Sequence, residues 1–358
     1  MATASEPITP ASASVRHVGL ELGLDDERWK TYVSSHPRAL AFHRPAWSQL
    51  LADCYGYRPF ALVVLDDEGA IAGGLPLVEV RGVRGRRWIG LPFTDFCPPL
   101  LQPGTNGGAF AQTLAQARTA AHVGSLEVRA ELDGPGVHRR ADAVTHSLAL
   151  AADPETLFER FHRSQVQRNI RRADREDLVV RRGETKSDLT RVYYRLHVET
   201  RRRLGAPAQP RRFFEGLWTR LLEPDHGRVM LVYAGSKPIA GAVFLTGGTT
   251  VTYKYGASDA SEWRLRPNHL LFWTAIRWAC EDGYRTFDFG RSDADDRGLR
   301  DFKSGWAARE EPLVYSTLAQ RAPASATGRS MGAARAVLRR SPTWLCRATG
   351  EIIYRFAA

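Results

Sequence analysis

The chain of 358 residues and 39.9 kDa is long enough for about two domains. Hydrophobic residues make up 43% of it and charged residues 25%, which excludes a chain that is disordered or collagen-like throughout. A formal charge of +11 and a pI near 9.8 indicate a negatively charged partner, although codon usage can also produce an arginine-rich composition.

The cysteines and histidines give no sign of a metal site. Cys54, Cys97, Cys280 and Cys346 lie far apart in the sequence, and no His-x-His or His-Glu-x-x-His pattern accompanies them. We therefore expect no metal, and four reduced thiols in a cytoplasmic protein.

The segment 1–14 is rich in Ala, Ser, Thr and Pro and has neither a basic start nor an apolar core. This composition predicts a disordered lead-in and not a signal peptide. No later run approaches the roughly 18 apolar residues of a transmembrane helix, so any membrane contact is expected to be peripheral, at the inner face.

A β-hairpin is predicted over 60–80. An apolar run over 60–65 is followed by the turn 66–69 and by a second apolar run up to position 80. The loop 91–100 follows, in which Asp95 lies among aromatic residues and prolines. Apolar surroundings can raise the pKa of a carboxyl group and let it take a proton from an attacking amine, or orient that amine. The alternative is an aspartate that only forms a turn.

A helix over 107–122 and a short strand over 126–128 come next. The same order returns as a hairpin over 229–245, a helix over 267–282 and a strand over 287–289. Two such units about 165 residues apart suggest a duplicated α/β domain, with chance similarity as the alternative. We place the two domains at 15–150 and 151–319. The second opens with Asp153 as a helix N-cap and Pro154 in the first helical position.

The second domain begins with a basic segment. Arg168, Arg171, Arg172 and Arg175 recur at spacings of three and four residues, which places them along one face of a helix. Such a face can bind phosphates, whereas most charge runs are only solvated surface.

Two charged motifs follow the last predicted strand. The segment 288–292 reads Asp-Phe-Gly-Arg-Ser, and Lys303 follows as the sole lysine after Lys254 in a chain that prefers arginine. A lone ammonium beside Phe302 can stabilise the oxyanion of an acyl-transfer intermediate; a surface lysine is the alternative. The sequence has no nucleophile elbow, Walker A loop or dinucleotide fingerprint, so direct transfer to a nucleophilic substrate is favoured.

The tail, 320–358, is predicted to be basic and amphipathic. Between Arg321 and Ala358 it carries seven arginines against the single acid Glu351, and apolar residues such as Trp344 and Ile352 are interleaved with them. This pattern suits a helix on an anionic membrane surface and equally a helix that packs back onto the fold.

Several motifs together resemble the FemAB family of the GNAT acyltransferase superfamily. They are the two Ile-Ala-Gly hairpins and the segments 252–258, 267–273, 287–292 and 302–306. The resemblance implies an α/β (α+β) protein of two tandem GNAT-like domains, each a mixed, mostly antiparallel sheet with flanking helices. It also implies transfer of an amino acid from aminoacyl-tRNA to an amine of a peptidoglycan precursor.

The resemblance implies roles for particular residues. Lys303 with Phe302 is similar to the family's Phe-Lys motif, whose lysine meets the acyl carbonyl or the donor's terminal nucleotide. Asp95 resembles an aspartate that the family places near the acceptor. Tyr253 and Tyr255 lie on a strand similar to the one that faces the inter-domain cleft in relatives.

The remaining candidates for substrate binding come from the same motifs. The segment 168–171, Arg-Asn-Ile-Arg, resembles the helix that opens the family's second domain. The further candidates in and beside these motifs are Arg172, Asn268, Asp288 and Arg291.

The donor stays open between aminoacyl-tRNA and acyl-CoA, with no tightly bound cofactor. The one match to the GNAT pyrophosphate loop, 329–334, lies in the polar tail, which disfavours acetyl-CoA. The expected acceptor is an amine-bearing cell-envelope precursor that can be lipid-linked. The alternatives are a CoA-dependent N-acyltransferase of exopolysaccharide or lipid biosynthesis and a non-catalytic protein that binds nucleic acid or membrane.

Overall fold

The computed structural model describes residues 16–82, 85–322 and 329–354. The predicted lead-in over 1–14 lies outside the described residues. No helix in the described ranges is both long and apolar enough to cross a membrane.

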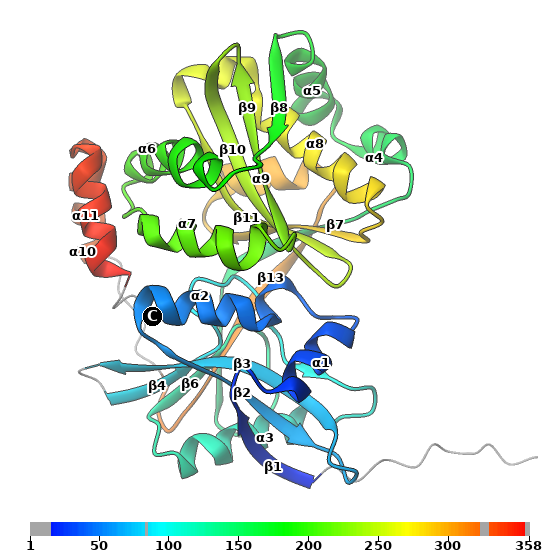
Figure 1. The fold of residues 1–358 in the computed structure, drawn as a ribbon, viewed down its shortest axis with the longest axis vertical. Helices are drawn as coiled ribbons and strands as arrows, with labels where there is room; N and C mark the ends of the chain where they lie inside the picture. Colours follow the sequence, from blue (N-terminus) through cyan, green and yellow to red (C-terminus); the bar gives the residue numbers. More distant parts are fainter. Residues whose placement is uncertain (1–15, 83–84, 323–328, 355–358) are drawn as a thin grey trace, which may run out of the picture.

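One 13-stranded sheet runs through both halves of the molecule (Figure 1). Its strands follow one another in space as β1-β2-β3-β4-β6-β13-β7-β12-β11-β10-β9-β8, and β5 pairs with β3 outside this order. The strands are β1 (Arg16–Leu22), β2 (Arg58–Leu65), β3 (Ile71–Gly82), β4 (Gly85–Ile89), β5 (Leu100–Leu101), β6 (Ser125–Val128), β7 (Val137–Ala149), β8 (Leu178–Arg182), β9 (Gly227–Ala234), β10 (Lys237–Gly247), β11 (Thr250–Ser258), β12 (Thr286–Asp293) and β13 (Arg309–Ala319). Neighbouring strands are antiparallel except for the pairs β4–β6 and β11–β12.

Helices flank the sheet, which confirms the expected mixed α/β class. The helices are α1 (Glu27–Ser35), α2 (Pro45–Tyr55), α3 (Gly107–Ala120), α4 (Pro154–Arg160), α5 (Arg168–Ala173), α6 (Tyr194–Leu204), α7 (Arg211–Leu217), α8 (Pro267–Glu281), α9 (Arg297–Ser304), α10 (Arg329–Arg340) and α11 (Thr343–Ile353). Short π-helical segments precede α5 and α6 and follow α7: η2 (Arg163–Gln167), η3 (Asp188–Tyr193) and η4 (Trp218–Leu222). The 3-10 segments are η1 (Ala41–His43) and η5 (Ala260–Leu265).

The predicted local elements form where the sequence signals place them. Both hairpins, β2–β3 and β9–β10, are antiparallel. The side chain of Asp153 accepts a hydrogen bond from the N–H of Glu155, and Pro154 occupies the first turn of α4. Asn106 caps α3 in the same way, through the N–H of Ala109. Each capped helix therefore begins where a side-chain acceptor satisfies a free backbone donor.

The two halves repeat one strand order and exchange their last strands. In the first half an antiparallel run ends with the parallel pair β4–β6, and in the second half β11–β12 stands in the same place. Beside β6 lies β13, from the end of the second half, and beside β12 lies β7, from the end of the first. The two exchanged strands pair with each other and so join the two halves of the sheet.

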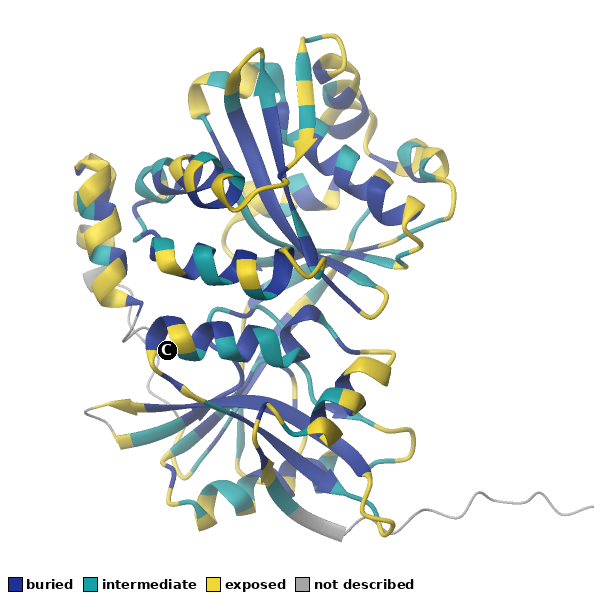
Figure 2. Cartoon of the chain, in the orientation of Figure 1, coloured by how far each residue is buried: buried dark blue, intermediate teal, exposed yellow. Residues whose placement is uncertain are grey.

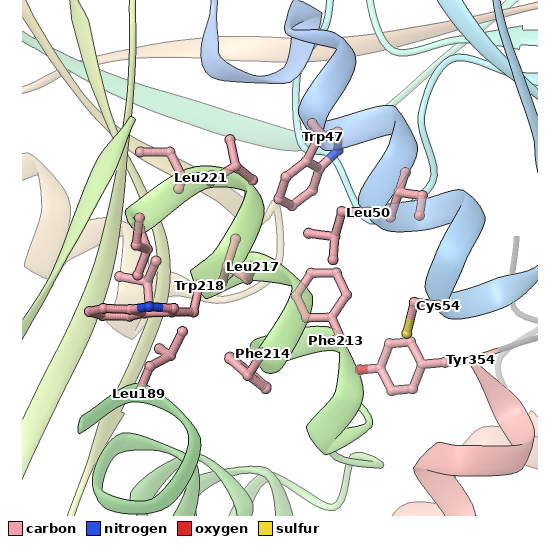
Figure 3. Close-up of a cluster of buried hydrophobic side chains, with 14 of the residues drawn as sticks. Trp47, Leu50, Cys54, Leu189, Phe213, Phe214, Leu217, Trp218, Leu221 and Tyr354 are labelled. Atoms are coloured by element: carbon pink, nitrogen blue, oxygen red, sulfur yellow. The ribbon is translucent and has the colours of Figure 1, made fainter. Parts of the chain in front are cut away.

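A hydrophobic cluster joins the halves. Trp47 and Leu50 of α2 face Phe213 and Leu217 of α7, and each of these side chains is buried (Figure 3). The rings of Trp47 and Phe213 meet edge to face at 6.0 Å. Full burial of a large apolar side chain contributes about 1.5–3 kcal/mol, so this cluster fixes the position of one half against the other.

The tail helices α10 and α11 pack back onto the fold and keep an exposed outer face (Figure 2). Leu338, Cys346 and Tyr354 are buried on the inner side, whereas Trp344 and Ile352 are 63% and 65% exposed. The structure therefore bears out the packing interpretation of the tail, and its outer face keeps the apolar residues that motivated the membrane interpretation.

Tyr354 ties the tail to both halves. Its ring contacts Tyr55 and Phe93 of the first half. Tyr57 donates a hydrogen bond to its carbonyl, and Arg201 of the second half donates to its hydroxyl at 3.1 Å. The end of α11 thus extends the core between the halves.

Candidate active site

A β-bulge in β11 shapes the site. Val243 and Phe244, which are adjacent in β10, pair with Tyr255 and Tyr253, so Lys254 is the extra residue in β11. Side chains of a regular strand alternate between its faces, and one extra residue reverses that alternation. Tyr253 therefore packs on one face against Phe244 and Tyr255 packs on the other.

The neighbouring strands open a cavity beside this bulge. β11 and β12 pair in parallel only from Thr250 to Thr252 and from Thr286 to Asp288. A cavity of about 490 Å³ lies beyond this point, with mostly apolar walls. Its lining residues are Asp95, Thr200, Arg203, Leu204, Gly241, Tyr253, Lys254, Gly256, Ala257, Ser258, Trp263, Asn268, Leu271, Phe272, Phe289, Gly290, Arg291, Asp296, Gly298, Leu299, Phe302 and Lys303.

Lys303 reaches this cavity from α9, whose N-terminus is capped by the side chain of Asp296. The lysine side chain is almost fully buried, and its Nζ donates to the carbonyls of Gly290 at 2.8 Å and Arg291 at 3.0 Å. Because an ammonium has three N–H groups, these two bonds leave one donor for a ligand. Burial lowers the pKa of Lys303 to about 8. The negative charges of the nearby aspartates act in the opposite direction and raise this pKa, but burial has the larger effect. The ammonium is therefore still charged at neutral pH.

A second lysine lies beside the predicted catalytic aspartate. Lys254 Nζ is 3.7 Å from Asp95 Oδ2, and its side chain is buried among the rings of Phe42 and Trp47. Burial lowers the pKa of Lys254, and the charge of Asp95 opposes this shift. The ammonium compensates the Asp95 carboxylate in an environment of low dielectric constant.

Asp288 is the second carboxylate of this cluster. Its Oδ1 accepts hydrogen bonds from the N–H of Gly290 at 2.8 Å and from the hydroxyl of Thr145 at 3.3 Å. Burial raises the pKa of Asp288 to about 6, and the charge of Asp95 adds to this shift. Two carboxylates and two lysines thus share the floor of the site, with a backbone N–H among them.

Six of the eleven predicted site residues line the cavity: Lys303, Asp95, Phe302, Tyr253, Asn268 and Arg291. Asp288 lies behind them and lines an adjoining cavity. Tyr255 does not line the first cavity, because the bulge turns its ring toward Phe213 and Phe214 in the core between the halves.

The predicted arginine face lies apart from this cavity. Arg168, Arg171 and Arg172 are exposed on α5, which packs against α8, and none of them lines the cavity. The guanidinium of Arg171 stacks over the ring of Phe158 at 5.3 Å. Phosphate binding by these arginines stays a prediction, and it would require a ligand that extends outside the cavity.

Sequence reasoning missed Lys254, and it missed the contact between Arg203 and Trp263. A lysine inside an apolar strand was the available signal for Lys254. Arg203 lies over the ring of Trp263 at 4.4 Å where both line the cavity, and no salt bridge to Arg203 is found within the described residues. Their sequence separation of 60 residues hid this contact.

No group of three or more His, Cys, Asp and Glu residues in the described ranges is arranged to hold a metal ion. The four cysteines are buried and free. The charge cluster of the site consists of two partly buried carboxylates, Asp95 and Asp288, and two buried ammonium groups, Lys254 and Lys303.

Comparison with known proteins places this site in context. Residues 160–304 match the family described as an acetyltransferase (GNAT) domain. A lipid II:glycine glycyltransferase of Staphylococcus aureus is 36% identical over 74 residues, which make up 19% of this chain and 18% of the relative. The match thus spans less than a fifth of that relative.

Solved structures extend the likeness to most of the chain. The crystal structure of FemX superposes with a TM-score of 0.67 at 16% identity, over 83% of this chain and 96% of that chain. A tandem GNAT protein from the clavulanic acid biosynthesis pathway has a TM-score of 0.51 at 15% identity, over 86% and 99% of the two chains. At such identities the structures establish the fold alone.

The comparisons confirm the expected resemblance to FemAB-like proteins of the GNAT superfamily. The GNAT match and the glycyltransferase likeness support the expected acyltransferase class. The matched GNAT segment contains α9 and the lysine at the floor of the cavity.

Proposed function

We propose that this chain, a FemAB-like protein with a GNAT domain, transfers an acyl or aminoacyl group from an activated donor to an amine of a cell-envelope precursor. The observation that carries the proposal is the charge cluster that lines the cavity, where Lys303 keeps one N–H free and the Asp95 carboxylate lies 3.7 Å from the ammonium of Lys254. The glycyltransferase named for lipid II supports a lipid-linked precursor as the acceptor.

The chemistry follows from these groups. The amine nitrogen attacks the carbonyl carbon of the donor ester or thioester, a C–N bond forms, and negative charge develops on the carbonyl oxygen. The free N–H of Lys303 stabilises this oxyanion, and Asp95 takes the proton that the amine loses. The C–O or C–S bond of the donor then breaks, and Asp95 returns the proton that it took from the amine to the departing oxygen or sulfur. Burial of the Lys303 ammonium strengthens its interaction with the oxyanion because water screens it less.

The cavity itself favours a donor that carries phosphate. Arg203 has an aromatic partner in Trp263 instead of an acid, so its charge is available at the cavity wall. Both aminoacyl-tRNA and acyl-CoA carry an adenosine with phosphates, and a guanidinium beside an indole can bind such a group.

The identity of the donor is tested by titration of the purified protein at two salt concentrations. The ligands are bulk aminoacylated tRNA and, in separate titrations, acetyl-CoA and a long-chain acyl-CoA. Binding of tRNA that survives physiological salt and needs the aminoacyl end supports the aminoacyltransferase. Binding of CoA thioesters with weak, salt-sensitive binding of tRNA supports the N-acyltransferase. If none of these donors binds, both transferase functions are contradicted, and the interpretation as a non-catalytic protein remains.

We further propose that the outer face of α10 and α11 rests on an anionic membrane. The exposed side chains of Trp344 and Ile352 lie among the arginines of the tail, such as Arg339 and Arg340. Apolar side chains beside cationic ones bind the boundary between lipid headgroups and acyl chains.

Sedimentation with vesicles of phosphatidylglycerol and of phosphatidylcholine tests this contact. The protein is expected to bind the anionic vesicles, and Trp344→Ser is expected to weaken that binding about tenfold. Val179→Ser is the matched control, because this exposed apolar residue lies on β8, far from the tail in the sequence. Equal binding of all three proteins would contradict the contact.

A further inference from the structure

A pocket of about 240 Å³ lies where the tail helix α11 packs against α6 of the second half (Figure 1). Cys346 of α11 donates a hydrogen bond to the carbonyl of Ala206 at 3.2 Å, and Glu351 forms a salt bridge with Arg212 of α7. These contacts fix α11 beside the second half. The lining of the pocket comes from η3, α6, α7 and α11, so the tail completes it.

The lining of this pocket is cationic. We call it the arginine pocket after the four arginines that line it, Arg191, Arg195, Arg211 and Arg347. Arg211 Nε lies 3.4 Å from Glu215 Oε1, so the charge of Arg211 is compensated. No salt bridge to the other three arginines is found within the described residues. Glu199 is the acidic residue of the lining, and three uncompensated arginines against this carboxylate leave a net charge of +2.

The free arginines approach the arginine pocket from two sides. Arg191 and Arg195 are exposed and four residues apart where η3 continues into α6, so they are neighbours on the helix surface. Like charges at this spacing repel each other, and an anion bound between them removes that repulsion. Arg347 comes from α11, where its guanidinium lies 6.0 Å from the ring of Tyr194. Guanidinium groups bind phosphate oxygens through paired N–H donors, so this set suits a phosphate.

An exposed indole lies at the edge of the same pocket. Trp344 follows Thr343, which lines the arginine pocket, and precedes Arg347 by three residues on α11. Its side chain is 63% exposed. Indole rings favour the boundary between lipid headgroups and acyl chains, and cationic pockets bind the phosphates of headgroups. A phosphate site with an apolar ring beside it therefore fits a lipid better than a free phosphate ion.

We propose that the arginine pocket binds the phosphate of an anionic phospholipid headgroup, with Arg191, Arg195 and Arg347 around the phosphate and Trp344 beside the glycerol and acyl chains. This inference deepens the membrane contact proposed above and rests on it, because the lipid comes from the same membrane. It makes that contact selective, since a pocket distinguishes headgroups, whereas a charged surface responds only to the charge of the membrane.

Calorimetry with a soluble lipid tests the arginine pocket in the full chain. Dihexanoyl phosphatidylglycerol is titrated below its critical micelle concentration, and dihexanoyl phosphatidylcholine and inorganic phosphate are titrated separately. The test variant combines Arg191→Gln with Arg195→Gln. The matched control combines Arg160→Gln with Arg163→Gln, which removes two exposed arginines of α4 and η2 that do not line the pocket.

Arg347→Gln is a second, independent variant, because this exposed arginine reaches the pocket from α11. Thermal melting shows that each variant folds. The wild type and the control are expected to bind phosphatidylglycerol equally, and about tenfold or more tightly than phosphatidylcholine or inorganic phosphate. The test variant and Arg347→Gln are expected to weaken this binding about tenfold or more.

Equal weakening in the test variant and the control would show that only the overall charge matters, and would overturn the proposal. Inorganic phosphate bound as tightly as phosphatidylglycerol would also overturn it, because the pocket would then be a site for free phosphate. Sedimentation with anionic vesicles but no binding of the soluble lipid would overturn the arginine pocket and leave the membrane contact. Binding of the soluble lipid without sedimentation would contradict the membrane contact alone.

Discussion

Gly290 and Asp95 meet where both line the cavity of the candidate site: a Cβ on Gly290 would lie 3.2 Å from Oδ2 of Asp95. The same Cβ would lie 3.2 Å from the carbonyl of Tyr253, and Gly290 has φ of +70°, which side chains rarely adopt. Both the space and the backbone conformation therefore require glycine at this position.

We expect Gly290→Ala to lower the free energy of unfolding by about 1–2 kcal/mol and to reduce transfer activity, because the methyl group displaces Asp95. Denaturant unfolding and steady-state kinetics check both effects. Gly235→Ala is the control, since that glycine also has a positive φ but lies in open space on a hairpin turn. Equal loss of activity in both variants would refute the role of this contact.

The pKa of Lys303, lowered to about 8, predicts a limb in the pH dependence of kcat. Above this pH the lysine loses its proton and with it the charge that stabilises the oxyanion, so kcat is expected to fall. In Lys303→Arg the guanidinium stays charged, and the residual activity is expected to lose this limb. The same limb in both proteins would mean that another group titrates.

The raised pKa of Asp288 means that its ionised carboxylate destabilises the folded state at neutral pH. The carboxyl binds its proton more tightly in the folded chain than in the unfolded one, so stability falls as the pH rises from about 4 to about 6. Asp288→Asn removes the destabilising negative charge and is expected to raise the free energy of unfolding at pH 7 by about 1–3 kcal/mol.

The gain from Asp288→Asn is expected to vanish below about pH 4, where both proteins are uncharged at this position. Urea unfolding at pH 7 and at pH 4 measures the difference. A variant that is less stable than wild type at pH 7 would show that the ionised carboxylate stabilises the fold.

The exchanged strands predict that the two halves do not fold alone. A cut at 150/151 separates β7 from β12 and β13 from β6, which leaves unpaired strand edges in each piece. We expect the fragments 16–150 and 151–358 to show no cooperative thermal transition alone and to regain one when they are produced together. A cooperative transition of either fragment alone would contradict this.

The sequence predicted local elements well and long-range pairing poorly. The hairpins, the capped helix at Pro154 and the helix over 267–281 follow from alternation and capping, which act over a few residues. The strand exchange could not be predicted in this way. It joins Leu318 of β13 to Leu126 of β6, residues that are far apart in the chain and carry no local signal of each other.

In the candidate site, too, the sequence predicted the residues that carry a local signal and missed those whose position depends on long-range pairing. Lys303 was identified from its motif and its rarity in an arginine-rich chain, and it lines the cavity as expected. Lys254 was missed because its burial depends on a bulge that shifts the register of β11 by one residue. Tyr255 was expected beside Tyr253 because both lie on one strand, and the same bulge sends the two rings to opposite faces.

The central claim is that the buried ammonium of Lys303 stabilises the transition state of acyl transfer. The most direct test is the transfer rate of Lys303→Ala under saturating donor and acceptor, with Lys186→Ala, an exposed lysine outside the site, as the matched control. We predict that Lys303→Ala lowers the rate by a factor of about 10² or more with an unchanged melting transition, and that Lys186→Ala has a normal rate. A folded Lys303→Ala protein that turns over at nearly the wild-type rate would contradict the claim.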